Sequence, residues 1–161
     1  MPIKFKMENK VLFGWTLIHQ TLDSIIRCEE MTFSNFGITA KQHAVLSAIQ
    51  NLDDPVTLKD LVDCFDRDSP SITFIINRME KDGLVSRVRD LKDRRSLRVI
   101  LTPKGKKIYQ STIKLKNKLS EEIMKVLSDE ELSAFIDSIE KIQEKTYEYR
   151  GVKMLVKEIK R

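Results

Sequence analysis

Apolar residues recur along most of this chain at intervals of three or four, the spacing that places them on one face of an α-helix. The clearest case lies between residues 68 and 81, where four apolar side chains stand at i, i+3, i+4 and i+7: Ile72, Ile75, Ile76 and Met79. Similar spacing occurs before residue 34, between residues 39 and 49, and in two segments that begin near Pro103 and Ser128. The pattern predicts a mainly helical protein.

Hydroxyl side chains mark where several of these helices should begin. Thr39, Thr57 and Ser128 are each followed three residues later by an amide or acidic side chain, which is the spacing of a capping box. Thr102 precedes Pro103, and proline suits a first turn because that turn does not use its missing N–H group. The sequence therefore predicts helices that start directly after these four hydroxyl residues.

Residues 57–105 predict a specific order of elements: a short helix, a turn, a second helix over 68–81 and a β-hairpin. The segments 84–89 and 96–101 are rich in β-prone residues, and the polar loop 90–95 between them suits a hairpin connection. This order is typical of a winged helix-turn-helix, in which the second helix enters the major groove of DNA and the hairpin is the wing.

The predicted DNA-binding residues lie on the outward face of the second helix and at the tip of the wing. Short polar side chains near the start of that helix can reach base edges. Phe74 could contact a thymine methyl group in the groove or pack against the neighbouring helix. The full set is Ser69, Pro70, Ser71, Thr73, Phe74, Asn77, Arg78, Lys92, Asp93, Arg94 and Arg95.

Basic residues crowd the predicted hairpin, because Arg87, Arg89 and Arg98 add to those at its tip. A positive hairpin directly after a recognition helix is where a phosphate backbone would lie. Such a charge run could instead be a solvated surface, as in a winged-helix adaptor that binds proteins and no specific DNA sequence.

Several motifs together resemble the MarR family of bacterial transcription regulators. They are Thr57-Leu-Lys-Asp-Leu, Ile76-Asn-Arg-Met-Glu-Lys-Asp-Gly-Leu-Val85, Asp93-Arg-Arg95 and Val99-Ile-Leu-Thr-Pro-Lys-Gly105. The resemblance extends from about Leu12 to Tyr147, and family members often carry arginine or another polar group where this chain has Phe74. It implies that Asp93 braces Arg95, and that Arg95 enters the minor groove.

The resemblance also implies a homodimer that forms through the N- and C-terminal helices. We therefore expect a mainly α fold with a small β-hairpin wing, a single domain overall with three regions. Residues 1–38 form the N-terminal dimerisation helix and loop, 39–103 the winged helix-turn-helix, and 104–161 the C-terminal dimerisation helices. The basic segment 151–161 is interpreted as part of the dimer interface, with a membrane surface as the alternative.

Composition agrees with a DNA-binding protein of the cytoplasm. The chain has 161 residues, a net charge of +5 and an isoelectric point near 9.2, which suits a polyanionic partner. Cys28 and Cys64, its two cysteines, suggest neither a zinc site nor a disulfide, and both are expected to be structural. No catalytic motif, membrane-spanning stretch or cofactor site is recognisable, so we expect no enzyme, no metal and no cofactor.

Family members respond to ligands that bind between the dimerisation helices and the winged domain. The resemblance implies an effector pocket here, with six candidate lining residues: Trp15, His19, Met31, Phe36, His43 and Tyr109. Aromatic and methionine side chains at helical spacing are also ordinary core residues. A second alternative is a thiol-based redox sensor in which Cys28 reacts with an oxidant. The expected function is a dimeric, sequence-specific transcription regulator, a ligand-responsive repressor of a pseudo-palindromic operator.

Overall fold

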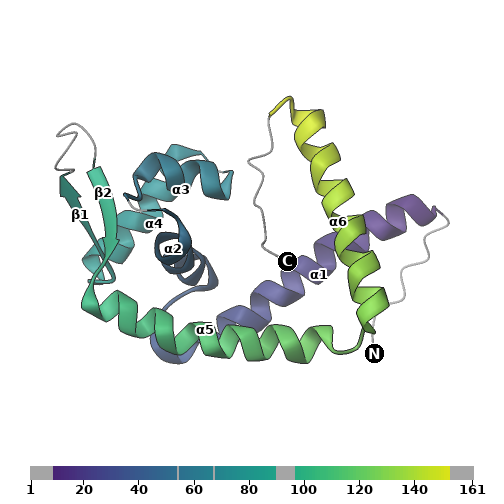
Figure 1. Ribbon diagram of the computed structural model, residues 1–161, viewed down its shortest axis with the longest axis horizontal. Coiled ribbons are helices and arrows are strands. Elements are labelled where there is room, and N and C mark those ends of the chain that lie inside the picture. The colour runs from purple at the N-terminus through teal and green to yellow at the C-terminus, as the bar shows by residue number, and fades with distance from the viewer. Residues whose placement is uncertain (1–8, 54, 67, 90–96, 153–161) are drawn as a thin grey trace.

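The computed structural model describes residues 9–53, 55–66, 68–89 and 97–152 (Figure 1). It confirms the predicted fold class, mainly α-helical with a small antiparallel hairpin. The tip of the wing, with Lys92, Asp93, Arg94 and Arg95, and most of the basic C-terminal segment lie outside the described residues. In chain order the elements are α1 (Lys10–Phe33), the 3₁₀ helix η1 (Ser34–Phe36), α2 (Ala40–Asn51), α3 (Leu58–Phe65), α4 (Ser69–Lys81), β1 (Val85–Arg89), β2 (Leu97–Leu101), α5 (Pro103–Met124) and α6 (Asp129–Arg150).

The predicted capping residues begin their helices. The Thr39 hydroxyl accepts a hydrogen bond from the backbone N–H of Gln42 (3.1 Å), and the Gln42 amide oxygen accepts one from the backbone N–H of Thr39 (2.9 Å). Reciprocal pairs of the same kind start α3 at Thr57 and α6 at Ser128. These bonds satisfy backbone donors that the first turn of a helix leaves unpaired.

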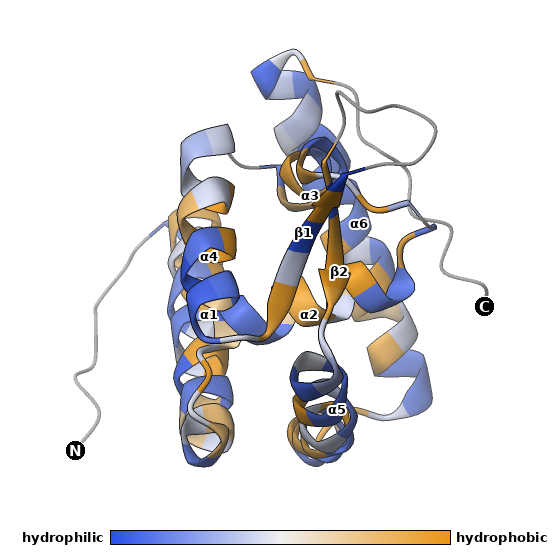
Figure 2. Ribbon diagram, turned by 90° about the vertical axis from the view of Figure 1, so that its left-hand side faces the viewer, coloured by the Kyte–Doolittle hydropathy of each residue, from blue (hydrophilic) through white to orange (hydrophobic). Residues whose placement is uncertain are grey.

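The hydrophobic core lies mostly within residues 40–101, which we call the winged head, and also includes Phe33 from the end of α1 and Ile38 from the segment before α2. In Figure 2 the two strands cross the head in front of α2. Of the four apolar residues that the spacing placed on one face of α4, Ile72, Ile76 and Met79 are at most 1% exposed, and Ile75 is half-buried against the core. The largest other apolar side chains that are fully buried in the core are Phe33, Leu46, Leu61 and Leu84.

The hairpin is joined to both neighbouring helices. Val85 pairs with Leu101 and Arg89 with Leu97, and the backbone N–H of Val99 donates to the carbonyl oxygen of Val56 (2.8 Å), just before α3. At the other side, a Cβ atom placed on Gly105 in α5 would lie 2.0 Å from the carbonyl oxygen of Leu84. Only glycine allows α5 to approach Leu84, the residue before β1, so closely.

The long helices α1, α5 and α6 extend away from the head, and α6 crosses α1 (Figure 1). Every residue of α6 is described, and none of them is buried. The Arg150 guanidinium at the end of α6 binds the carboxylate of Asp66, in the turn after α3, with one N–O distance of 2.9 Å. The apolar spacing of the sequence continues from Ile108 to Val126 and predicts that the helix after Pro103 includes Val126. That prediction is wrong, because α5 ends at Met124 and Val126 is exposed in the following turn.

Candidate nucleic-acid interface

The outer face of α4 is the exposed surface of the helix-turn-helix. Asp68 caps the helix: its carboxylate accepts hydrogen bonds from the backbone N–H (3.0 Å) and the hydroxyl (2.7 Å) of Ser71. The Ser71 hydroxyl therefore donates its one hydrogen to Asp68, but its oxygen can still accept a hydrogen bond. Most of the residues predicted on this face are exposed, namely Ser69, Pro70, Phe74, Asn77 and Arg78, while Ser71 and Thr73 are half-buried.

Phe74 stands out because it is 69% exposed. Packing against the neighbouring helix therefore covers little of its ring. An aromatic side chain on the outer face of a recognition helix can make an apolar contact with a thymine methyl group in the major groove. Of the two predicted roles for Phe74, its exposure favours the groove.

A second part of the surface lies where α4 meets the wing. Arg87 on β1 reaches back to α4, and its guanidinium donates to the amide oxygen of Asn77 (2.6 Å) and to the carboxylate of Glu80 (3.1 Å). The same carboxylate accepts a hydrogen bond from the backbone N–H of Arg87 (2.9 Å). The sequence pattern counted Arg87 among the basic residues of the wing and did not predict this pairing, because helical spacing carries no information about a strand that packs beside the helix.

The structure separates the six predicted effector residues into distant groups. His43 is fully buried and stacks on Phe33, with 4.3 Å between ring centroids, and lies 6.1 Å from the Tyr109 ring. Trp15 and His19 contact each other on α1, with ring centroids 5.2 Å apart. The remaining two differ in burial: Phe36 packs partly against the core and Met31 is exposed.

Burial lowers the pKa of His43 from 6.5 to about 4. The positive charge of Lys116 contributes to this lowering of the pKa, and the negative charge of Glu29 acts in the opposite direction. The imidazole is therefore neutral near pH 7. Both ring nitrogens lack a hydrogen-bond partner among the described residues, so His43 serves the fold mainly through stacking.

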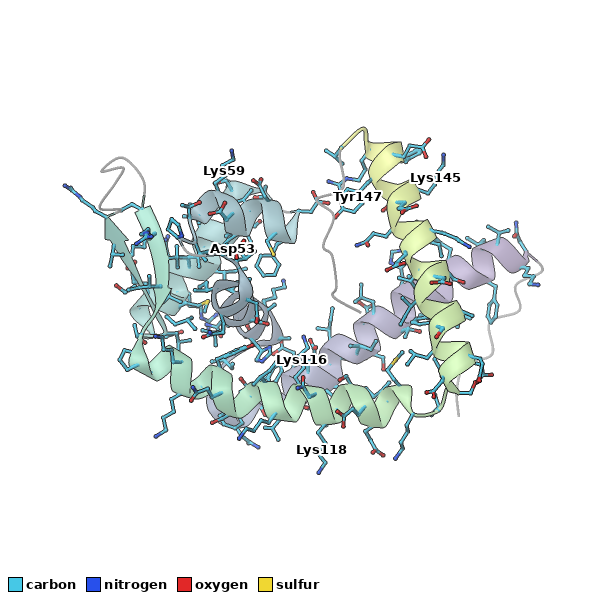
Figure 3. All side chains as sticks on the ribbon, viewed as in Figure 1. Asp53, Lys59, Lys116, Lys118, Lys145 and Tyr147 are labelled. Atoms are coloured by element: carbon cyan, nitrogen blue, oxygen red, sulfur yellow. The ribbon has the colours of Figure 1, made fainter. Side chains whose placement is uncertain are left out.

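A cavity of about 580 Å³ lies between the winged head and α5. The sequence did not predict it, because its wall combines small and polar residues from three separate helices. Figure 3 shows Lys116 on the side of α5 that faces the head. None of the six predicted residues lines it, although the Asn51 amide on its wall donates to the Tyr109 hydroxyl (3.2 Å). The lining residues are Ala44, Ser47, Ala48, Asn51, Leu52, Asp53, Cys64, Phe65 and Lys116.

The two cysteines were expected to be structural, buried residues, but they are less buried than that. Both are half-buried, and Cys64 lines the 580 Å³ cavity, where the sequence pattern had predicted a core position. Among the described residues, no three His, Cys, Asp or Glu side chains are grouped so that they could hold a metal ion. The described helices also include none that is long and apolar enough to cross a membrane.

Comparison with known proteins identifies what this architecture is similar to. Residues 36–96 match the model of the MarR family. The uncharacterised HTH-type transcriptional regulator YsmB of Bacillus subtilis (strain 168) is 32% identical over 110 residues, which cover 68% of this chain and 75% of YsmB.

Two solved structures share the fold. One is a mutant of MarR from E. coli in complex with operator DNA, with a TM-score of 0.76, 24% identity and coverage of 86% of this chain and 99% of that one. The other is the organohalide-sensing regulator RdhR in its 2,4-dichlorophenol-bound form, with a TM-score of 0.77, 22% identity and coverage of 91% and 90%.

Proposed function

Because the chain belongs to the MarR family of transcription regulators, we propose that it acts as a homodimeric repressor that binds a pseudo-palindromic operator in the cytoplasm. Proteins of this family are transcription regulators and not enzymes. The observation that carries the proposal is the outer face of α4, a capped helix that exposes short polar side chains and Phe74 beside a hairpin. We propose that the predicted residues of α4 and of the wing tip contact DNA.

Exposed apolar side chains on α1 and α6 support the homodimer. A groove of about 920 Å³ runs between the first half of α1 and the end of α6, with Trp15, Ile18 and Ile142 in its wall. Further along, Leu22 of α1 is 54% exposed and Phe135 of α6 is 46% exposed. Contiguous apolar surface of this kind is unfavourable in water and typical of an interface. A second copy related by a two-fold axis would cover the same faces on both chains.

The dimer explains how an effector would act. Two recognition helices enter successive major grooves only if they stand about 34 Å apart. The 580 Å³ cavity lies between the head and α5, which continues into the dimerisation region, so a molecule that fills it would change the position of the head. Its walls carry both apolar side chains and polar groups such as Lys116, which suits a small phenol or aromatic carboxylate.

Selection of bound fragments from random duplex DNA tests the proposal. We expect enriched sites with two inverted half-sites whose centres lie about one helical turn apart. Phe74→Arg should change the preferred base within the half-site, because a guanidinium favours guanine where an aromatic ring favours the thymine methyl group. An unchanged preference would place Phe74 outside the groove.

Affinity without sequence preference would contradict the proposed function and favour the protein-binding adaptor. The effector part is tested separately, by titrating a panel of phenols and aromatic carboxylates into the protein bound to its selected site. Release of DNA by a compound should disappear in Ala48→Phe, which fills the cavity, and persist in Ser133→Phe, an exposed position on α6.

A further inference from the structure

Three side chains join the recognition helix to the first strand of the wing. Glu80 on α4 holds Arg87 of β1 at two points, through its backbone N–H (2.9 Å) and its guanidinium (3.1 Å). The other arm of the guanidinium donates to the amide oxygen of Asn77, one turn earlier on α4 (2.6 Å). The Arg87 side chain is 23% exposed, so this bond is partly shielded from water.

The chemistry of arginine decides which way the Asn77 amide is turned. A guanidinium has hydrogen-bond donors and no acceptor, so the amide atom that faces it is the oxygen. Arg87 cannot follow the amide if it rotates, because Glu80 holds both its backbone and its side chain. Asn77 is exposed, and no bond from its amide nitrogen to another described residue is seen. Because the amide oxygen faces Arg87 on β1, the group that Asn77 turns towards a partner on the outer face is the NH₂, which is a donor.

We propose that Arg87 is a positioning residue that fixes Asn77 as a hydrogen-bond donor, so that Asn77 binds an acceptor on DNA. The inference rests on the proposed function, since it assumes that the outer face of α4 meets a duplex. The acceptor is either a base edge, such as guanine O6 and N7 or thymine O4, or a phosphate oxygen. Bidentate recognition of adenine needs both the oxygen and the nitrogen of an asparagine amide. Arg87 disfavours it, because its guanidinium covers one side of the amide oxygen and holds that oxygen towards β1.

Arg87 also has a different role from the other basic residues of the hairpin. Its charge is balanced by Glu80, whereas Arg89 at the end of the same strand is exposed. Arg89 therefore serves as the matched control, because its replacement removes one positive charge from β1 and leaves the Asn77 amide in place.

The experiment is selection from randomised duplexes with the full-length protein, followed by competition between single-base variants of the selected site. If the acceptor is a base, one position should favour guanine or thymine by about tenfold, and Asn77→Ala should abolish that preference. Asn77→Asp should favour cytosine at the same position, because the outward carboxylate oxygen can only accept. Arg87→Met should free the Asn77 amide and raise the relative affinity for adenine at that position, whereas Arg89→Met should leave the base preference unchanged.

If the acceptor is a phosphate, the same variants give a different pattern. Asn77→Ala should weaken binding to all sequences by a similar factor, and Asn77→Asp should weaken it further through repulsion. Each preference is a ratio within one competition, so a smaller folded fraction of Arg87→Met does not affect it.

Any one of three results would overturn the inference. The first is a wild-type preference for adenine that Asn77→Ala removes. The second is an Asn77→Ala variant with the affinity and base preference of the wild type, and the third is an Asn77→Asp variant that binds as tightly as the wild type with the same preference. A failure of the proposed function would give a result that differs from these three. A wild-type protein that binds all sequences equally contradicts sequence-specific regulation, while the affinities of the two Asn77 variants still test whether that side chain only donates.

Discussion

His43 illustrates how a single residue acquires its properties from burial. Its folded pKa is about 4, below the usual 6.5, so the unfolded chain binds more protons between these two values. The free energy of unfolding should therefore be unaffected above pH 6.5 and fall as the pH drops from 6.5 towards 4. This loss should amount to about 2 kcal/mol at roughly pH 5.

Replacement of His43 by phenylalanine isolates that effect. The new side chain keeps an aromatic ring beside Phe33 and Tyr109 but cannot take up a proton, so His43→Phe should lose less stability between about pH 7 and pH 5 than the wild type. Urea denaturation at both pH values measures the difference, and any constant packing cost cancels because each protein is compared with itself. Equal losses in the two proteins would show that other groups cause the acid sensitivity.

At the scale of elements, the junction between the hairpin and α5 depends on Gly105. A methyl group at this position would collide with the carbonyl oxygen of Leu84, and backbone atoms cannot move aside as the end of a long side chain can. We expect Gly105→Ala to lower the free energy of unfolding by about 1–3 kcal/mol, the usual range for overpacking. Lys106→Ala, at the exposed neighbouring position, should change it by less than about 0.5 kcal/mol. If the two variants unfold at similar urea concentrations, α5 can move away from Leu84 to make room for the methyl group.

The elements themselves were largely predictable. Capping pairs and apolar spacing identified the starts of α2, α3, α4, α5 and α6, because both signals act within four residues of the chain. Placement of β1 and β2 was also correct to within one residue of their observed starts. The end of α5 was missed, since no glycine or proline marks the turn that contains Val126.

For the whole molecule, the exposed apolar face of α6 should decide the oligomeric state. Ile139→Glu places a charge on that face and should convert the proposed dimer into a monomer or unfold it, because a carboxylate is costly to bury without a partner. Ala134→Glu adds the same charge at an exposed position on another side of the helix and should leave the dimer intact. Sedimentation at micromolar concentration measures the mass, and circular dichroism measures the helical content. A folded wild-type monomer that retains full DNA affinity would contradict the proposed architecture.

Sequence alone determined which segments become helix or strand and which family they resemble, because these signals are local and repeat at fixed intervals. Contacts between distant residues were decided only by the tertiary structure. The Asn51 amide donates a hydrogen bond to Tyr109, which lies 58 positions later in the sequence, and Arg150 donates to Asp66, which lies 84 positions earlier. The cavity beside α5 and the Arg87 bond to Asn77 likewise join separate elements. Their partners depend on how the elements pack, and helical or strand periodicity does not encode which faces will meet.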